Sequence, residues 1–215
     1  MSDHPNARKL AFHGAGAVTA VVVAGLLLSG CGTAPEPDAA AKPSASSSDR
    51  AFNDADVAFA QAMIPHHQQA LEMARLADGR AEDAGVKKIV ADVEKAQDPE
   101  IRTMRSWLKA WGKPEAPEGS AASGGHGGHG GGGEGAGSMA GMMSEQDMKA
   151  LAALRGKAFD RKFAELMIAH HEGAVEMAEA ERKNGRDATA RKLADDVVRT
   201  QSAEITELKK ILGRF

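Results

Sequence analysis

The chain has 215 residues, of which 42% are hydrophobic and 27% charged, and its formal net charge is −3 at pH 7. This composition fits one or two small globular domains and excludes a polytopic membrane protein, and the small negative charge gives no electrostatic footprint for nucleic acid. Aromatic residues make up 4% and there is a single cysteine, which disfavours a large β-sandwich and excludes an intrachain disulfide framework, so an all-α fold is expected. Two counts are high, with 24 glycines and 10 methionines.

Residues 1–30 are expected to be an export signal. Two basic residues precede an apolar run over residues 15–28, which is shorter than the roughly 20 residues of a membrane-spanning helix. The run ends in Leu28-Ser29-Gly30-Cys31, which resembles the lipobox of bacterial lipoproteins. We therefore expect lipidation of Cys31 and a mature chain anchored at the outer face of the cytoplasmic membrane or in the cell envelope. The alternative is an ordinary cleavage site beside a cysteine. Residues 31–49, rich in Pro, Ala and Ser, are expected to be a disordered tether.

The sequence contains one segment twice. At an offset of 104, residues 56–110 align with residues 160–214 without a gap, and twenty of the fifty-five positions are identical. The strongest match is Met-Ile-Pro-His-His at 63–67 against Met-Ile-Ala-His-His at 167–171. A gapless match of this length indicates duplication of one supersecondary unit.

Each unit, residues 50–112 and residues 144–215, is expected to fold as a helical hairpin. In the first helix the apolar residues and both histidines recur at steps of three and four, which places them on one broad face. This face comprises Phe59, Ala60, Met63, Ile64, His66, His67, Ala70, Leu71, Met73, Ala74 and Ala77. Two hairpins, each apolar on one face, can bury those faces against each other, so residues 50–215 are predicted to form a single four-helix bundle.

The stretch between the hairpins, residues 113–143, is predicted to be a flexible linker. Twelve of the 24 glycines of the chain lie between Gly119 and Gly141. The linker also holds two histidines and three methionines, namely His126, His129, Met139, Met142 and Met143. The sequence Ser144-Glu145-Gln146-Asp147 resembles a capping box and predicts a short extra helix before the second hairpin.

Histidine and methionine occur together in both predicted hairpins, and this pairing suits copper. Soft thioethers favour Cu(I), and imidazole accepts Cu(I) or Cu(II). A di-iron bundle would instead use Glu-x-x-His spacing, whereas the residue three before His66 is Met63. The candidate ligands are Met63, His66, His67, Met73, Met167, His170, His171 and Met177, with Met104 and the linker residues His126, His129, Met139, Met142 and Met143 as additional candidates.

The helical spacing predicts that the ligands of one ion come from one helix. Met63, His66 and His67 lie within one turn of each other. Met73 is ten residues from Met63, roughly 15 Å along a helix, so it would have to bind a second ion.

Other roles for the same residues stay open. Methionine at helical spacing also fills cores, a buried histidine can be satisfied by hydrogen bonds alone, and the linker residues suit weak metal capture or a solvated spacer. Recurrent glutamates suit surface charges, ion pairs or hard ligands, and these are Glu72, Glu100, Glu176 and Glu204. Gln97 and Gln201, together with Glu100 and Glu204, are expected to support the ligands, the amides by bonding the free ring nitrogens of ligating histidines.

The Met-Ile-x-His-His segments, each followed by Glu-Met-Ala and later by Gln-x-x-Glu-Ile at 97–101 and 201–205, resemble the bacterial domain-of-unknown-function family 305. The resemblance covers nearly all of residues 52–213. It implies a ferritin-like helical bundle, export, and copper binding related to copper tolerance. The second unit departs from the first at Leu208, which replaces Met104, so the two sites would be unequal if Met104 is a ligand.

The leading hypothesis is an exported, lipid-anchored copper-binding protein without enzymatic activity. It would sequester copper, support tolerance, or hand copper to a protein partner outside the membrane. No phosphate loop, nucleotide motif or Ser/His/Asp order is recognised in the sequence. Two alternatives stay open, a ferritin-like metal oxidase that uses the His and Glu residues, and a metal-free envelope interaction module in which the histidines merely pack.

Overall fold

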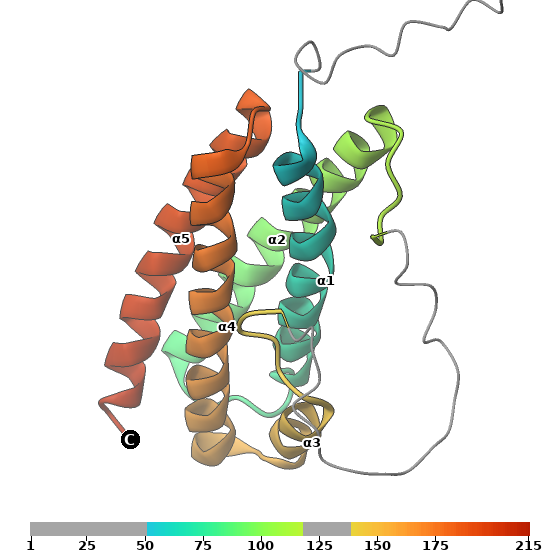
Figure 1. Ribbon diagram of the computed structural model, residues 1–215. Helices are drawn as coiled ribbons and strands as arrows, with labels where there is room; N and C mark the ends of the chain where they lie inside the picture. Colours follow the sequence, from blue (N-terminus) through green and yellow to red (C-terminus); the bar gives the residue numbers. More distant parts are fainter. Residues whose placement is uncertain (1–50, 118–138) are drawn as a thin grey trace, which may run out of the picture. The chain divides into compact units, whose positions relative to one another are not determined.

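The computed structural model describes residues 51–117 and 139–215, and these residues form five α-helices without a strand (Figure 1). The helices are α1 (Asp54–Leu76), α2 (Ala84–Ala110), α3 (Glu145–Ala153), α4 (Gly156–Asn184) and α5 (Ala188–Leu212). The predicted all-α fold is confirmed. The export signal, the tether with Cys31, and the linker histidines His126 and His129 lie outside the described residues.

Four of the five helices begin where the sequence supplies a capping side chain, whereas Arg155 at the start of α4 makes no side-chain cap bond. Asn53 caps α1 by accepting the N–H groups of its first turn, and Asp83, Ser144 and Asp187 cap α2, α3 and α5 in the same way. The Ser144 cap is the predicted capping box. α1 is followed by Gly79, whose φ of 63° lies in the left-handed region that favours glycine.

The four long helices pack through the faces that the periodicity selects. α1 packs against α2, α4 packs against α5, and the two pairs meet through α1 with α4 and α2 with α5. Every residue of the predicted apolar face of α1 is buried. The short helix α3 packs against α1 and α4. Within the described part of the chain, no helix is long and apolar enough to cross a membrane.

Two aspartates tie the helix pairs together reciprocally. Asp56, in the first turn of α1, accepts the N–H groups of Arg186 and Asp187 in the α4–α5 turn, both at 2.9 Å. Asp160, near the start of α4, accepts the N–H of Asp83 in the α1–α2 turn at 2.8 Å. Both carboxylates are fully buried. Each pair of helices therefore fixes the turn of the other pair.

The linker predicted over residues 113–143 includes five residues at its end that pack against the helices. Residues 139–143, which we call the strap, lie against the bundle instead of forming a free spacer. The backbone of Met143 is hydrogen-bonded to Gln69 of α1, and the N–H of Met142 donates to the carbonyl of Met139. These residues are held in place because their backbone groups are hydrogen-bonded and their side chains make apolar contacts.

Candidate metal centre

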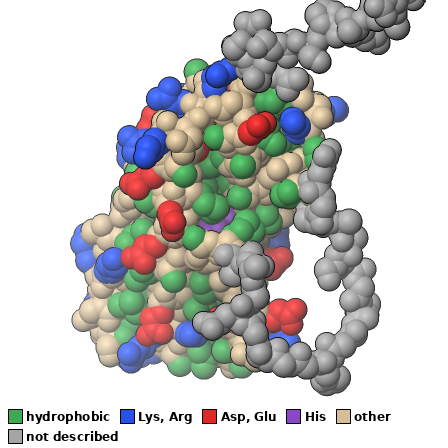
Figure 2. Space-filling model, viewed as in Figure 1, with side chains coloured by type: hydrophobic (Ala, Val, Ile, Leu, Met, Phe, Trp, Pro, Cys, Tyr) green, Lys and Arg blue, Asp and Glu red, His purple; other side chains and the backbone are tan. Residues whose placement is uncertain are grey.

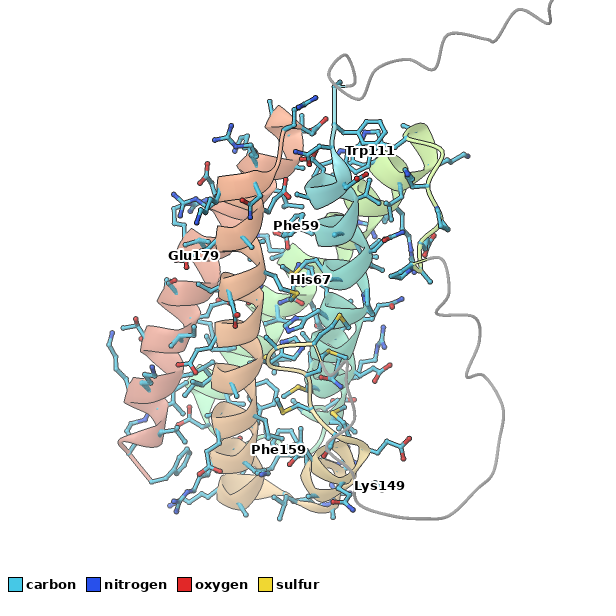
Figure 3. The ribbon with its side chains drawn as sticks, in the orientation of Figure 1. Phe59, His67, Trp111, Lys149, Phe159 and Glu179 are labelled. Carbon is cyan, nitrogen blue, oxygen red and sulfur yellow. The ribbon has the colours of Figure 1, made fainter. Side chains whose placement is uncertain are left out.

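A layer of four buried histidines lies halfway along the bundle. α1 supplies His66 and His67, α4 supplies His170 and His171, and all four are 0% exposed. Figure 3 labels His67 within this layer, between α1 and α4. In Figure 2 the histidines show only as a small surface at the bottom of a gap among hydrophobic side chains. We call these four residues the histidine cluster.

The cluster joins the two units, which the sequence did not predict. The ring centroids of His66 and His170 are 3.8 Å apart, with the rings tilted by 38°. The His170 and His171 centroids are 6.3 Å apart. The expectation of one ligand set per helix did not include this contact, since helical spacing reports neighbours along one helix and not those across α1 and α4.

Two of the histidines are held by carboxylates. Nε2 of His67 lies 2.7 Å from a carboxylate oxygen of Glu100 on α2, and Nε2 of His171 lies 2.6 Å from one of Glu204 on α5. An ionised carboxylate can only accept a hydrogen bond, so Nε2 carries the proton in both rings and Nδ1 keeps its lone pair. Carboxylates that fix the tautomer of a histidine in this way are typical of histidines that bind metals through the other nitrogen.

His66 has the same tautomer for a different reason. Its Nε2 lies 3.1 Å from the carbonyl oxygen of Ala140 in the strap, so Nε2 donates and Nδ1 is free to accept. Among the described residues, the Nδ1 atoms of all four cluster histidines lack a hydrogen-bond partner, and His170 also lacks one at Nε2. Buried polar atoms are normally paired. Unpaired ring nitrogens at one level of the core therefore point to a ligand that supplies the missing interaction.

Burial favours the neutral form of His66 and His170. Removal from water lowers the pKa of His66 to about 4, and the nearby His67 lowers it further. Burial likewise holds the pKa of His170 well below its ordinary value, with His66 and His171 acting in the same direction. A neutral imidazole is the form that binds a metal ion, so these two rings are ready to bind without first losing protons.

The predicted methionine ligands divide into two groups. Met63, Met73, Met104 and Met167 are fully buried in the core. Met177, by contrast, is half-buried and lines a surface depression together with Phe59 and Glu181, away from the cluster. The three strap methionines are also half-buried. Met63 and Met167 stand one helical turn before the paired histidines, which makes them the thioethers best placed in sequence to join the cluster.

The predicted amide partners do not bond the imidazoles. Gln97 and Gln201 are buried as expected, but neither bonds a histidine Nδ1, and the side-chain oxygen of each lacks a partner among the described residues. The bonds to His67 and His171 come from Glu100 and Glu204 instead. The sequence predicts a supporting role for the glutamines and for the glutamates alike. It does not show which of them bonds a histidine, because that depends on how the two helices pack. The other recurrent glutamates, Glu72 and Glu176, are exposed.

The donor set fits copper better than a hard metal ion. No group of three or more His, Cys, Asp or Glu side chains in residues 51–117 and 139–215 is arranged to hold a metal ion. Imidazole nitrogens, with the thioethers of Met63 and Met167 one helical turn away, are the donors at this level of the core, and that mixture suits copper.

Sequence reasoning missed several residues that hold the helix pairs or the strap in place. Asp56 and Asp160 are identical at the offset of 104, a signal that was available but unused. Gln69 and Gly173 contact the strap, and they occupy equivalent positions in the two units with different residue types. The sequence signal for the contact at Gly173 is that a glycine stands in the middle of a predicted helix.

Comparisons with known proteins agree with this architecture. A family model, Domain of unknown function (DUF305), matches residues 56–212. A DUF305 protein from Streptomyces coelicolor is 28% identical, with a TM-score of 0.63, and the match covers 74% of this chain and 93% of that one. A DUF305 fragment from Deinococcus radiodurans is 30% identical, with a TM-score of 0.61 and coverage of 76% and 98%.

A third solved structure was determined with a metal ion. CopM in its Cu(II)-bound form is 34% identical to this chain, with a TM-score of 0.59, and the match covers 74% of this chain and 96% of CopM. CopM has also been solved in Cu(I)-bound and Ag-bound forms. A search among curated protein sequences gives no match.

Proposed function

The chain belongs to the DUF305 family, and on that premise we propose that it is an exported copper-binding protein with its metal site in the histidine cluster. A lipid at Cys31 anchors it to the membrane. Its folded part is a four-helix bundle of ferritin-like type, built from two duplicated hairpins. It sequesters copper outside the cytoplasmic membrane or passes it to a protein partner, and it performs no catalysis.

One observation carries this proposal. Four imidazoles share one buried layer, and the Nδ1 atom of each lacks a hydrogen-bond partner among the described residues. A cluster that only filled the core would leave these polar atoms unsatisfied, at a cost of about 1–3 kcal/mol for each atom. A bound metal ion removes that cost. The solved copper complexes of CopM, about one-third identical in sequence, support copper as the ion.

Each residue of the site has a distinct role in this proposal. The Nδ1 atoms of the cluster supply the nitrogen ligands, no more than two of them to one ion, since no three His, Cys, Asp or Glu side chains of the described residues are placed to hold one. Glu100 and Glu204 hold His67 and His171 in the required tautomer. The thioethers of Met63 and Met167 favour Cu(I) over harder cations. The apolar core around the layer excludes water, which keeps His66 and His170 neutral and protects the bound ion from exchange.

A competition titration tests the proposal. The exported form, starting at residue 31 with Cys31→Ser, is titrated with Cu(I) against a chromophoric chelator, since it lacks thiols and contains all five helices of the described residues. His66→Gln with His170→Gln should weaken Cu(I) binding roughly 100-fold or more, because two ligands are lost. The matched control is His126→Gln with His129→Gln, which should leave this affinity unchanged.

Three other results would contradict the proposal. Equal binding by the cluster variant and the parent would move the site to the linker. Absence of copper binding by the parent would favour the metal-free interaction module. Tight iron binding with oxygen consumption would favour the metal oxidase. Circular dichroism of each variant shows whether the bundle is folded.

A further inference from the structure

The strap, residues 139–143, crosses the bundle beside the histidine cluster. In Figure 1 it is the yellow loop next to α4, and it leads into Ser144, the N-cap of α3. The carbonyl oxygen of Ala140 lies 3.1 Å from Nε2 of His66. A segment without helical structure thus contacts a buried imidazole directly.

Gln69 of α1 holds one end of the strap. Its Nε2 donates to the carbonyl of Met143 at 2.9 Å, and the N–H of Met143 donates to its Oε1 at 2.7 Å. Both ends of the side-chain amide are used, so rotation of this one side chain breaks both bonds. The neighbouring Gln68 is exposed and contributes neither bond.

Gly173 of α4 lets the strap approach the helix. A Cβ at this position would lie 2.1 Å from the carbonyl oxygen of Ala140 and 2.4 Å from its carbonyl carbon. Gly141 in the strap has φ +77°, and a Cβ there would lie 2.6 Å from the carbonyl oxygen of Ala169. Glycine is a poor helix former, so its place in the middle of α4 is explained by this contact. At the equivalent position the other unit has Gln69.

We propose that the strap is the gate through which Cu(I) enters and leaves the histidine cluster. The hydrogen bonds of Gln69 and the close contact at Gly173 hold this gate closed. This inference rests on the proposed function and adds the route of exchange. The other walls of the cluster are long helices whose backbone groups are bonded within each helix, and moving one would expose the core.

The strap, by contrast, is fixed to α1 by three hydrogen bonds, two with Gln69 and one with His66. It also carries Met139, Met142 and Met143, whose thioethers suit Cu(I). Displacing the strap breaks the bond between His66 and Ala140. Opening of the gate and release of a cluster ring are therefore one event.

Metal-exchange kinetics test the gate. The exported form with Cys31→Ser is loaded with Cu(I), mixed with excess chromophoric chelator, and the release rate is followed by absorbance. Gly173→Ala places a Cβ where the strap packs against α4, and Gln69→Ala removes both hydrogen bonds to Met143. Each should speed loading and release roughly fivefold or more, because the open state gains population when these contacts are lost. Gln68→Ala and Gly213→Ala are the matched controls, since a Cβ at Gly213 meets only ordinary contacts of 3.5 Å or more, and both should exchange like the parent.

A second measurement needs no metal. Diethyl pyrocarbonate modifies accessible imidazoles, and peptide mapping identifies the modified rings. In the metal-free protein, Gly173→Ala and Gln69→Ala should raise modification of His66 and His170 roughly fivefold or more over the parent and both controls. Intact Cu(I) binding with unchanged exchange and unchanged modification would overturn the gate alone. A parent chain that fails to bind Cu(I) would overturn the proposed function and the gate with it.

Discussion

His66 and His170 lie ring against ring in the middle of the bundle, with centroids 3.8 Å apart, although they belong to different repeats of the sequence. They occupy equivalent positions at the offset of 104. One histidine pair thus lies against the pair that matches it in sequence. Under the proposed function, the consequence is a single metal centre shared by both units in place of one centre in each.

A shared centre predicts non-additive losses. His66→Gln and His170→Gln should each remove most of the Cu(I) affinity of the cluster, and the double variant should be little worse than either single one. Residues that act on one site are coupled in this way, whereas independent sites add. Competition titration of the three variants measures the effect. Retention of half the bound copper at full affinity in each single variant would indicate two separate centres.

The carboxylates behind the cluster should control its affinity. Glu100→Gln with Glu204→Gln keeps the size of both side chains but removes the charge that fixes Nε2–H on His67 and His171. We expect Cu(I) affinity to fall roughly 10- to 100-fold, as is common when the partner of a ligating histidine is removed. The matched control exchanges the exposed Glu72 and Glu176 for Gln. Equal losses in the two double variants would show that the total charge matters and the tautomer does not.

The neutral histidines should make the metal-free protein sensitive to acid. In the folded state the pKa of His66 is lowered to about 4 because the ring is buried, while the unfolded chain takes up this proton near pH 6.5. The unfolded state therefore binds more protons between these values, and stability should fall as pH drops from 6.5 toward 4, by up to about 1.4 kcal/mol per pH unit for this residue. Urea unfolding of the parent and of His66→Gln at several pH values measures it. An unchanged pH dependence in His66→Gln would contradict the assignment.

Glu181 should act in the opposite direction at higher pH. Burial, followed by the neighbouring Asp56 carboxylate, raises its pKa to about 8. The folded state keeps a proton that the unfolded chain releases near 4.5, so stability should fall as pH rises from 4.5 to 8 and then level off. Glu181→Gln should flatten this decline in urea unfolding experiments. Glu179→Gln, at an exposed site on the same helix, is the control and should leave the slope as in the parent. A slope retained in Glu181→Gln would refute the assignment.

The features that sequence could predict are those set within one helix. The apolar face of α1 follows from local periodicity, and the Ser144 capping box follows from four consecutive residues. The contact between His66 and His170 could not be predicted, because it depends on the register of α1 against α4. The strap was misread because its partners, Gln69 and Gly173, lie on two different helices and a glycine-rich stretch shows no periodicity.

The most direct test of the shared centre is anomalous diffraction at the copper edge from crystals of the exported form loaded with Cu(I). The account predicts one strong anomalous peak inside the bundle, within bonding distance of Nδ1 atoms from both α1 and α4. Copper peaks confined to surface methionines or to the linker, with the cluster histidines still free at Nδ1, would contradict it.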